Sequence, residues 1–366
     1  MIKIIPAKSG KRKDSGIILL IVLWLLVILS LIAIGLGRRT SVDFSLAKYG
    51  VGKLKADFTA RAGLTYALEQ ISRDAQDSTT AAWDTLYQCG VKIEEGQVPE
   101  DIFKHAAVGE GYFDIQYSVA ALDGTVNARY GLQDETAKIN LNALNQVNFS
   151  VLKHLITFLG FEDGVANTVA AAVVDWVDAD SDVTAAPHGA EDDDYMSLSK
   201  PYHCKNLPFD SLEELFLVKG MTSEIFATLK DYVTVYPKET DTLSINVNTA
   251  PEVVIRALGY SLPDSTADAD RITRNIIAYR SGEDQEIFTA DDRPVELIDP
   301  GKMGFTDSET GFLHNLRNRG LGLSSNYFRV NIRGVTEASL IKSDIEAVVS
   351  RENSERNSDV LFWRRK

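Results

Sequence analysis

The longest hydrophobic segment of the chain lies close to its amino terminus. Residues 17–37 contain no charged side chain. A helix over this segment would be roughly 31 Å long, which is close to the thickness of about 30 Å of a bilayer hydrocarbon core. The preceding cations favour a cytoplasmic amino terminus; they are Lys3, Lys8, Lys11, Arg12 and Lys13. The pattern predicts one membrane-spanning helix.

A cleaved secretory signal is the alternative interpretation of this segment. Such signals have an apolar core of about 7–15 residues followed by a small-x-small cleavage site. The segment here is longer and ends in Gly-Leu-Gly, directly before Arg38 and Arg39. These features favour a retained anchor.

Apolar residues continue beyond the anchor at steps of three and four, the spacing typical of an amphipathic helix. No proline occurs between residues 17 and 98. We therefore predict one long helix over residues 17–74, with its first half in lipid and its second half on a soluble domain. The apolar positions are Leu46, Tyr49, Val51, Leu54, Phe58, Ala62, Leu64, Tyr66, Leu68 and Ile71.

Strand patterns flank a long helical zone. Asp123-Gly124 favours a hairpin turn between the first two of them. Strands that are interrupted by helices and then resume predict an insertion into a small sheet domain. The predicted fold class is α+β: a long amino-terminal helix on a small antiparallel sheet, with a large all-helical insertion between strands. The strand patterns occupy residues 112–122, 127–141, 327–351 and 360–365, and the helical zone occupies residues 140–322.

The helical zone contains a weak internal repeat. Residues 139–143 read Ile-Asn-Leu-Asn-Ala, residues 245–249 read Ile-Asn-Val-Asn-Thr, and each segment precedes two helix patterns. We interpret the polar residues as caps and turn formers. The predicted caps are Asn142 and Thr249 at helix starts and Gly160 and Gly259 at helix ends.

Residues 211–235 resemble a helix-hairpin-helix. In forms that bind nucleic acid, the backbone N–H groups of the turn hold a phosphate. Here Lys219 is the one cation of the turn, and it is surrounded by Glu213, Glu214 and Glu224. A hairpin that packs within the protein is the favoured interpretation.

The charge balance narrows the classes of partner. The net charge is −14, from 52 acidic and 38 basic residues. A surface of this sign repels phosphate backbones, which argues against nucleic acid as a partner. Cys89 and Cys204 are too few for a disulfide scaffold or a cysteine-type zinc site. One disulfide between them and two unpaired thiols both remain open.

Residues 175–195 concentrate carboxylates and contain no Lys or Arg. Asp178, Asp180 and Asp182 alternate as they do at the start of calcium loops, and hard oxygen ligands in a long loop suit calcium. The segment is not an EF-hand, because Val183 and Gly189 stand where that motif requires glycine and glutamate. A solvated acidic loop is the competing interpretation.

A catalytic interpretation requires a second partner for these carboxylates. His188 and His203 lie nearby in the sequence, so a metal-dependent hydrolase anchored in the membrane is the alternative function. The chain contains no H-E-x-x-H, G-x-S-x-G or P-loop motif. We therefore predict that the protein is not an enzyme.

Gly16 lies between the basic leader and the apolar segment, which resembles a type IV prepilin leader. Such leaders are cut after the glycine, which would make Ile17 the first, often N-methylated, residue. Ile21 stands where most related pilins carry a glutamate.

The chain as a whole resembles the type II secretion system protein K family, the large minor pseudopilins, which also lack that glutamate. The resemblance rests on residues 23–26, 138–142, 175–180, 189–192 with Tyr195, 215–221, 245–251 and 360–364.

The resemblance implies a pilin-type fold and a role at the tip of a short periplasmic pseudopilus. The chain would assemble there with other minor pseudopilins and support export of folded proteins across the outer membrane. Further implied partners are the prepilin peptidase and the inner-membrane secretion platform. The body would be periplasmic on a single-pass inner-membrane anchor. A nucleic-acid binder of a DNA-uptake pilus is a third alternative.

The resemblance also implies calcium in the helical insertion, as a structural ion. The candidate ligands are Asp178, Asp180, Asp182, Glu191, Asp192 and Asp194. The predicted organisation is a leader (1–16), a transmembrane segment (17–37), a pilin-like helix with the first strands (38–139), the helical insertion (140–325) and the returning strands (326–366).

Overall fold

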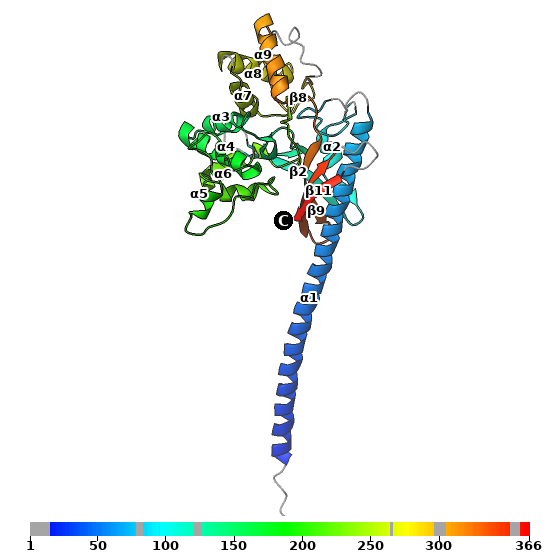
Figure 1. Cartoon of the computed structure of the whole chain (residues 1–366). Helices are drawn as coiled ribbons and strands as arrows, with labels where there is room; N and C mark the ends of the chain where they lie inside the picture. Colours follow the sequence, from blue (N-terminus) through cyan, green and yellow to red (C-terminus); the bar gives the residue numbers. More distant parts are fainter. Residues whose placement is uncertain are drawn as a thin grey trace, which may run out of the picture.

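The computed structural model describes residues 15–77, 83–94, 96–120, 126–263, 266–295, 305–351 and 359–366. Its longest helix, α1 (Ser15–Gln76, 62 residues), projects far below the body of the protein (Figure 1). Among the described residues it is the one helix long and apolar enough to cross a membrane. The predicted long helix is confirmed. Residues 1–14 of the predicted leader lie outside the described residues.

The upper part of α1 lies on an antiparallel sheet with the strand order β1-β2-β9-β10-β11, in which β3 pairs with β2 and β4 pairs with β9. The predicted returning strands are present. The predicted turn at Asp123-Gly124 lies outside the described residues, but its two arms pair as expected. The strands are β1 (Ala106–Val108), β2 (Gly111–Ala120), β3 (Val126–Tyr130), β4 (Gln133–Asp134), β9 (Tyr327–Thr336), β10 (Lys342–Ser350) and β11 (Asp359–Arg365), and α2 (Pro99–Phe103) precedes them.

Small residues bring α1 close to this sheet. A side chain at Gly334 of β9 would collide with the backbone of Ala56 and Ala60, and one at Gly63 would collide with Ile332. Glycine is therefore required where helix and strand approach most closely. The core beneath α1 includes Ile71, Phe103, Phe113, Ile115, Phe328, Val330, Ile345, Ala347 and Val349.

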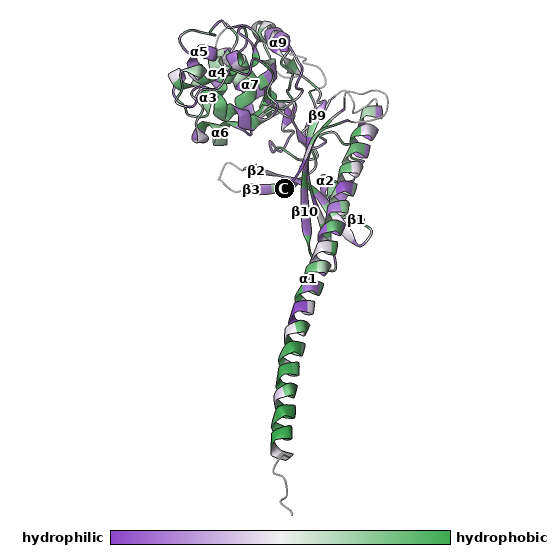
Figure 2. Ribbon diagram, turned by 60° about the horizontal axis from the view of Figure 1, so that its bottom comes forward, coloured by the Kyte–Doolittle hydropathy of each residue, from purple (hydrophilic) through white to green (hydrophobic). Residues whose placement is uncertain are grey.

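The chain leaves the sheet after β4, builds a mainly helical body, and returns at β9. This body has its own hydrophobic core, so it is a second folding unit above the sheet (Figure 2). Its helices are α3 (Ser150–Phe158), α4 (Asp163–Val177), α5 (Asp192–Met196), α6 (Ser223–Leu229), α7 (Glu252–Tyr260), α8 (Thr266–Arg280) and α9 (Asp307–Arg319), with the 3-10 helices η1 (Leu141–Ala143) and η2 (Leu212–Leu217) and the short strands β5 (Ile139–Asn140), β6 (Val233–Thr234), β7 (Ile245–Asn246) and β8 (Leu321–Gly322).

The internal repeat corresponds to two units built in the same way. Each unit begins with a short strand that pairs in parallel with the strand closing it, β5 with β6 and β7 with β8. The buried Asn142 amide bonds to the backbone of Phe209 and Val235. Asn248 makes the equivalent bonds to Val295 and Leu323. In each unit, one buried asparagine therefore hydrogen-bonds to two separate backbone segments.

Two of the predicted caps, Asn142 and Thr249, are wrong. The side chain that caps η1 is Asn140, because Asn142 points into the core. Pro251 occupies the N-cap of α7, and Thr249 donates instead to Asp134. Gly259 lies at the end of α7 as predicted, in the last turn, where the helix packs on Ala269. Gly160, with a φ of 100°, follows the end of α3 as predicted.

Replacing either buried asparagine should destabilise its unit. Asn142→Ala removes three hydrogen bonds and leaves buried backbone groups unpaired, so we expect the free energy of unfolding to fall by about 2–3 kcal/mol. Denaturant unfolding of the full chain in detergent measures this. Asn318→Ala, at an exposed position of α9, should change it by less than about 0.5 kcal/mol. Equal effects of the two variants would contradict the assignment.

Buried polar groups join the helical body to the sheet. Asp134 at the end of β4 accepts hydrogen bonds from the hydroxyls of Thr249 and Ser325 and from the Asn246 amide. Burial, together with the charge of the nearby Asp84, raises the pKa of Asp134 to about 6. The relative position of the two bodies is therefore set by directional bonds and not by a shared apolar core.

The two cysteines are unpaired. Cys89 lies in the core between α1 and the sheet, whereas Cys204 lies in the core of the helical body. Of the two alternatives left open by the sequence, the structure therefore has two buried thiols and no disulfide between them.

Candidate metal site and assembly surface

The acidic segment is folded back on itself by a carboxylate at the end of α4. The two oxygens of Asp175 accept from the backbone N–H groups of Thr184, at 2.9 Å, and Ala190, at 2.6 Å. A side chain at Gly189 would collide with Asp175, so this position needs glycine. The turn brings Glu191, at the start of α5, back to the end of α4.

Three carboxylates meet where this loop closes. One ligand oxygen from each of Asp178, Asp180 and Glu191 lies within 4.8 Å of the other two. Glu191 is only 5% exposed, and neither of its oxygens has a hydrogen-bond partner among the described residues. One oxygen of Asp178 is also buried without a partner. Buried, unpaired carboxylate oxygens are unfavourable unless a cation neutralises them.

The pKa values of Glu191 and Asp178 also indicate that the cluster favours a neutralising cation. Burial, together with the charges of Asp175 and Asp178, raises the pKa of Glu191 to about 7. Burial also raises the pKa of Asp178 to about 6, with Asp180 as the next cause. A divalent cation would favour the ionised form of both groups and remove their mutual repulsion.

The other three candidate ligands lie apart from this cluster. The Asp182 backbone N–H donates to Asp180. Asp192 pairs with His203, at 2.9 Å, and accepts from the backbone of Cys204. Asp194 pairs with Lys219. Asp192 and Asp194 occupy the first turn of α5, a position that favours carboxylates in any helix.

The residues on which a metal-dependent hydrolase or a nucleic-acid binder would depend also make other contacts. His203 binds Asp192 outside the cluster, and His188 contacts Thr168. Lys219, the cation of the hairpin turn, donates to Gly189 and Asp194 inside the protein. The segment between η2 and α6 is therefore a packing hairpin, as the sequence predicts.

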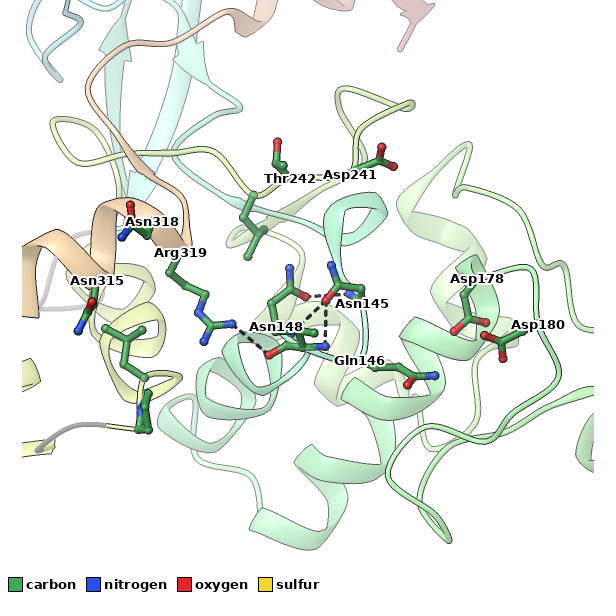
Figure 3. Close-up of a pocket in the computed structure, with 14 residues that line it drawn as sticks. Asn145, Gln146, Asn148, Asp178, Asp180, Asp241, Thr242, Asn315, Asn318 and Arg319 are labelled. Carbon is green, nitrogen blue, oxygen red and sulfur yellow. Dashed lines mark hydrogen bonds between the residues drawn. The ribbon is translucent and has the colours of Figure 1, made fainter.

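The cluster borders a wide cleft between the two helical units. Asp178 and Asp180 line one side of this cleft of about 900 Å³, and Asn315 and Arg319 of α9 line the opposite side (Figure 3). Arg319 crosses to the first unit and donates to the carbonyl of Val147, at 3.1 Å. A cation can therefore reach the carboxylates from solvent without unfolding of the loop.

A second surface lies on α1. Several large apolar side chains of α1 beyond residue 37 remain exposed. Four of them follow one another at spacings of seven, three and four, as in the seam of a coiled coil. We call them the α1 seam: Phe44 (71% exposed), Val51 (55%), Leu54 (59%) and Phe58 (66%). The transmembrane part of α1 is continuously hydrophobic, whereas the upper part, which carries the seam, mixes hydrophobic and hydrophilic residues (Figure 2).

Comparison with known proteins identifies the family. Residues 137–238, which include the carboxylate cluster, match the family model described as type II secretion system (T2SS), protein K. Type II secretion system protein K of Pectobacterium carotovorum subsp. carotovorum is 30% identical over 245 residues, which are 66% of this chain and 68% of the relative. The chain belongs to the type II secretion system protein K family. The Klebsiella pneumoniae member is 28% identical over 65% of this chain and 67% of its own length.

Membership of this family confirms the predicted function as a minor pseudopilin of type II secretion. The fold agrees with it: in the crystal structure of the GspK-GspI-GspJ complex from enterotoxigenic Escherichia coli, one chain matches 90% of this chain and 99% of its own length, with a TM-score of 0.57 and 18% identity. The predicted pilin-like α+β architecture is thereby confirmed. The single apolar α1 agrees with anchoring in a membrane by one helix.

Proposed function

We propose that this protein K chain is a structural subunit at the tip of the pseudopilus, where it docks with other minor pseudopilins through the α1 seam. The exposed seam is the observation that carries this proposal, because a row of apolar side chains on a helix in water is stabilised by a second helix. A solved relative is described in complex with GspI and GspJ, which supports partners of the same kind here.

The anchor limits the geometry of this docking. The seam lies on the same continuous helix as the apolar residues 17–37, and a short polar stretch that includes Arg38 and Arg39 separates the two. A helix that covers the seam and follows α1 toward its amino terminus therefore reaches the membrane. Another membrane-anchored pilin-like helix meets this requirement. Ile21 leaves no carboxylate in this part of α1, which suits a subunit that docks onto no earlier subunit. We also propose that the body lies on the periplasmic face of the inner membrane and that the leader lies in the cytoplasm.

A charge in the α1 seam should prevent assembly. We expect Phe58→Lys to lower affinity for the two companion minor pseudopilins at least about tenfold, because it places a desolvated cation in an apolar helix contact. Co-purification and titration of the full chains in detergent measure this. Leu340→Lys, at an equally exposed position outside α1, is the control. Unchanged binding of the Phe58 variant would exclude the seam as the docking surface.

Processing by the prepilin peptidase is tested by the mass of the membrane-extracted protein. We expect a chain that begins at an N-methylated Ile17 after cleavage following Gly16. An intact Met1 in the mature protein would contradict this processing. Loss of residues 17–37 would contradict the anchor.

We further propose that Asp178, Asp180 and Glu191 hold one structural calcium ion that ties the acidic loop to the end of α4. Their oxygens are the hard ligands that calcium prefers, and the loop leaves the cleft side open for water and backbone ligands. Equilibrium dialysis of the full chain should show Ca²⁺ binding that Asp180→Asn abolishes. Asp182→Asn should leave it intact, because Asp182 lies outside the cluster.

A further inference from the structure

The last strand, β11, leaves one edge of the sheet open. It pairs with β10 on one side, and no described residue pairs with its other side. A free edge carries backbone N–H and C=O groups that an additional strand can complete. The register between β10 and β11 shifts between Val348 and Val349. Phe362–Arg365 pair regularly beyond this shift, so they form the usable part of the edge.

The open edge faces a corner between β11 and α1. The Arg61 guanidinium lies 5.3 Å from the centre of the Trp363 ring, and Arg365 pairs with Asp57 at 2.6 Å. These contacts place β11 beside the part of α1 that carries Phe58, one turn from Arg61 (Figure 1). Trp363 nevertheless remains 49% exposed. The corner therefore offers an aromatic surface next to unpaired backbone groups.

The charge along β11 is opposite in sign to that of the whole chain. Arg61 and Arg365 lie on the α1 side of the strand, and Arg364 and Lys366 pair with Glu346 on its opposite face; all four side chains are about half exposed. Of the carboxylates that face them, Asp57 and Glu346 are buried, and Glu213, 3.7 Å from Arg364, is exposed. Two copies of β11 would therefore repel each other, whereas an acidic segment is attracted.

We propose that the corner between α1 and β11 receives an extended acidic segment of another minor pseudopilin, which adds to Phe362–Arg365 as a further strand. This inference rests on the proposed assembly with such subunits. It assigns a second contact, made by the sheet, in addition to the contact of the α1 seam. The backbone bonds supply affinity, and Trp363 and the surrounding cations select the segment.

Hydrogen exchange of the full chain in detergent, with and without the two companion minor pseudopilins, tests the added strand. We expect amides of Phe362–Arg365 to exchange at least about tenfold more slowly in the complex. Amides of β1, the opposite edge, serve as the internal control and should not change. Unchanged exchange in β11, measured in a complex that forms, would overturn the added strand but leave the α1 contact in place.

Two variants test the selection of an acidic segment. Trp363→Ser should weaken the complex about tenfold or more, and Lys366→Glu should weaken it with a smaller dependence on salt. The matched controls are Leu340→Ser and Ala107→Glu, both at exposed positions away from β11. Equal affinities of Lys366→Glu and wild type would overturn the charge selection. Absence of any complex with the wild-type chain would instead contradict the proposed function itself.

Discussion

Arg351→Met should lower the free energy of unfolding by about 3–5 kcal/mol, the largest effect expected of any single substitution in this protein. The Arg351 side chain is 6% exposed and pairs with Asp74 and Asp84, each at 2.6 Å. Methionine fills a similar volume, so the loss comes from the removal of the guanidinium between two buried carboxylates. Denaturant unfolding of the full chain in detergent measures it.

The position of Arg351 explains why so much depends on it. Asp74 belongs to the end of α1, Asp84 to the segment that follows α1, and Arg351 directly follows β10. The guanidinium also donates to the carbonyl of Ser325, whose hydroxyl bonds to Asp134 at the junction with the helical body. One cation thus connects α1, the sheet and the insertion.

Arg333→Met is the matched control for this prediction. Arg333 of β9 also pairs with a carboxylate, Asp344, at 2.8 Å, but both side chains are more than a third exposed. Solvent screens such a pair, so we expect a change below about 1 kcal/mol. Equal losses for the two arginines would show that burial of the Arg351 pairs does not govern stability.

Calcium should stabilise the chain by about 2.7 kcal/mol at a free concentration one hundred times its Kd. Glu191→Gln should abolish this response, because it removes a charged ligand. Asp192→Asn should retain it, because Asp192 pairs with His203 and not with the cluster. Thermal melting in chelator and in graded Ca²⁺ measures both. A melting temperature that is independent of Ca²⁺ in the wild-type chain would exclude the proposed site.

The pH dependence provides an independent check of the same cluster. Without calcium, the pKa of Glu191 in the fold is about 7, above its ordinary value of 4.5. A raised folded pKa contributes stability below pH 4.5 that is lost as the pH rises through 7. We expect the contribution of Glu191 to this loss to be roughly 1–2 kcal/mol in chelator, so the loss should be smaller by that amount in Glu191→Gln, where Asp178 and Asp134 still contribute. At saturating calcium, the free energy of unfolding should instead rise with pH, because the metal binds the ionised carboxylates.

Local patterns in the sequence predict most of the secondary structure. The uncharged residues 17–37 and the apolar steps after them require a long helix, since that spacing places the apolar side chains on a common face. The alternation in residues 327–351 requires strands with one buried face. The two Ile-Asn-x-Asn segments mark the two helical units, although their capping roles are misassigned because Asn142 and Thr249 bond to groups far along the chain.

The carboxylate cluster shows how much of the metal site can be predicted from the sequence. An acidic segment without Lys or Arg is evident by inspection, and it contains all three residues of the cluster. Which of the acidic residues converge depends on Asp175. Its carboxylate accepts hydrogen bonds from the backbone of Thr184 and Ala190, and this turn brings Glu191 close to Asp178. Asp192 and Asp194 are neighbours of Glu191 in the sequence, but the first turn of α5 directs them to His203 and Lys219.

The sequence by itself determined the anchor, the order of helices and strands, the repeat and the family, because each depends on short-range periodicity or on motifs in chain order. Only the tertiary structure decided which carboxylates converge, that the two cysteines stay in separate cores, that Arg351 joins Asp74 to Asp84, and that β11 leaves an open edge beside α1. Those features depend on distances between residues far apart in the chain, which are set by the packing of α1, the sheet and the helical body against one another.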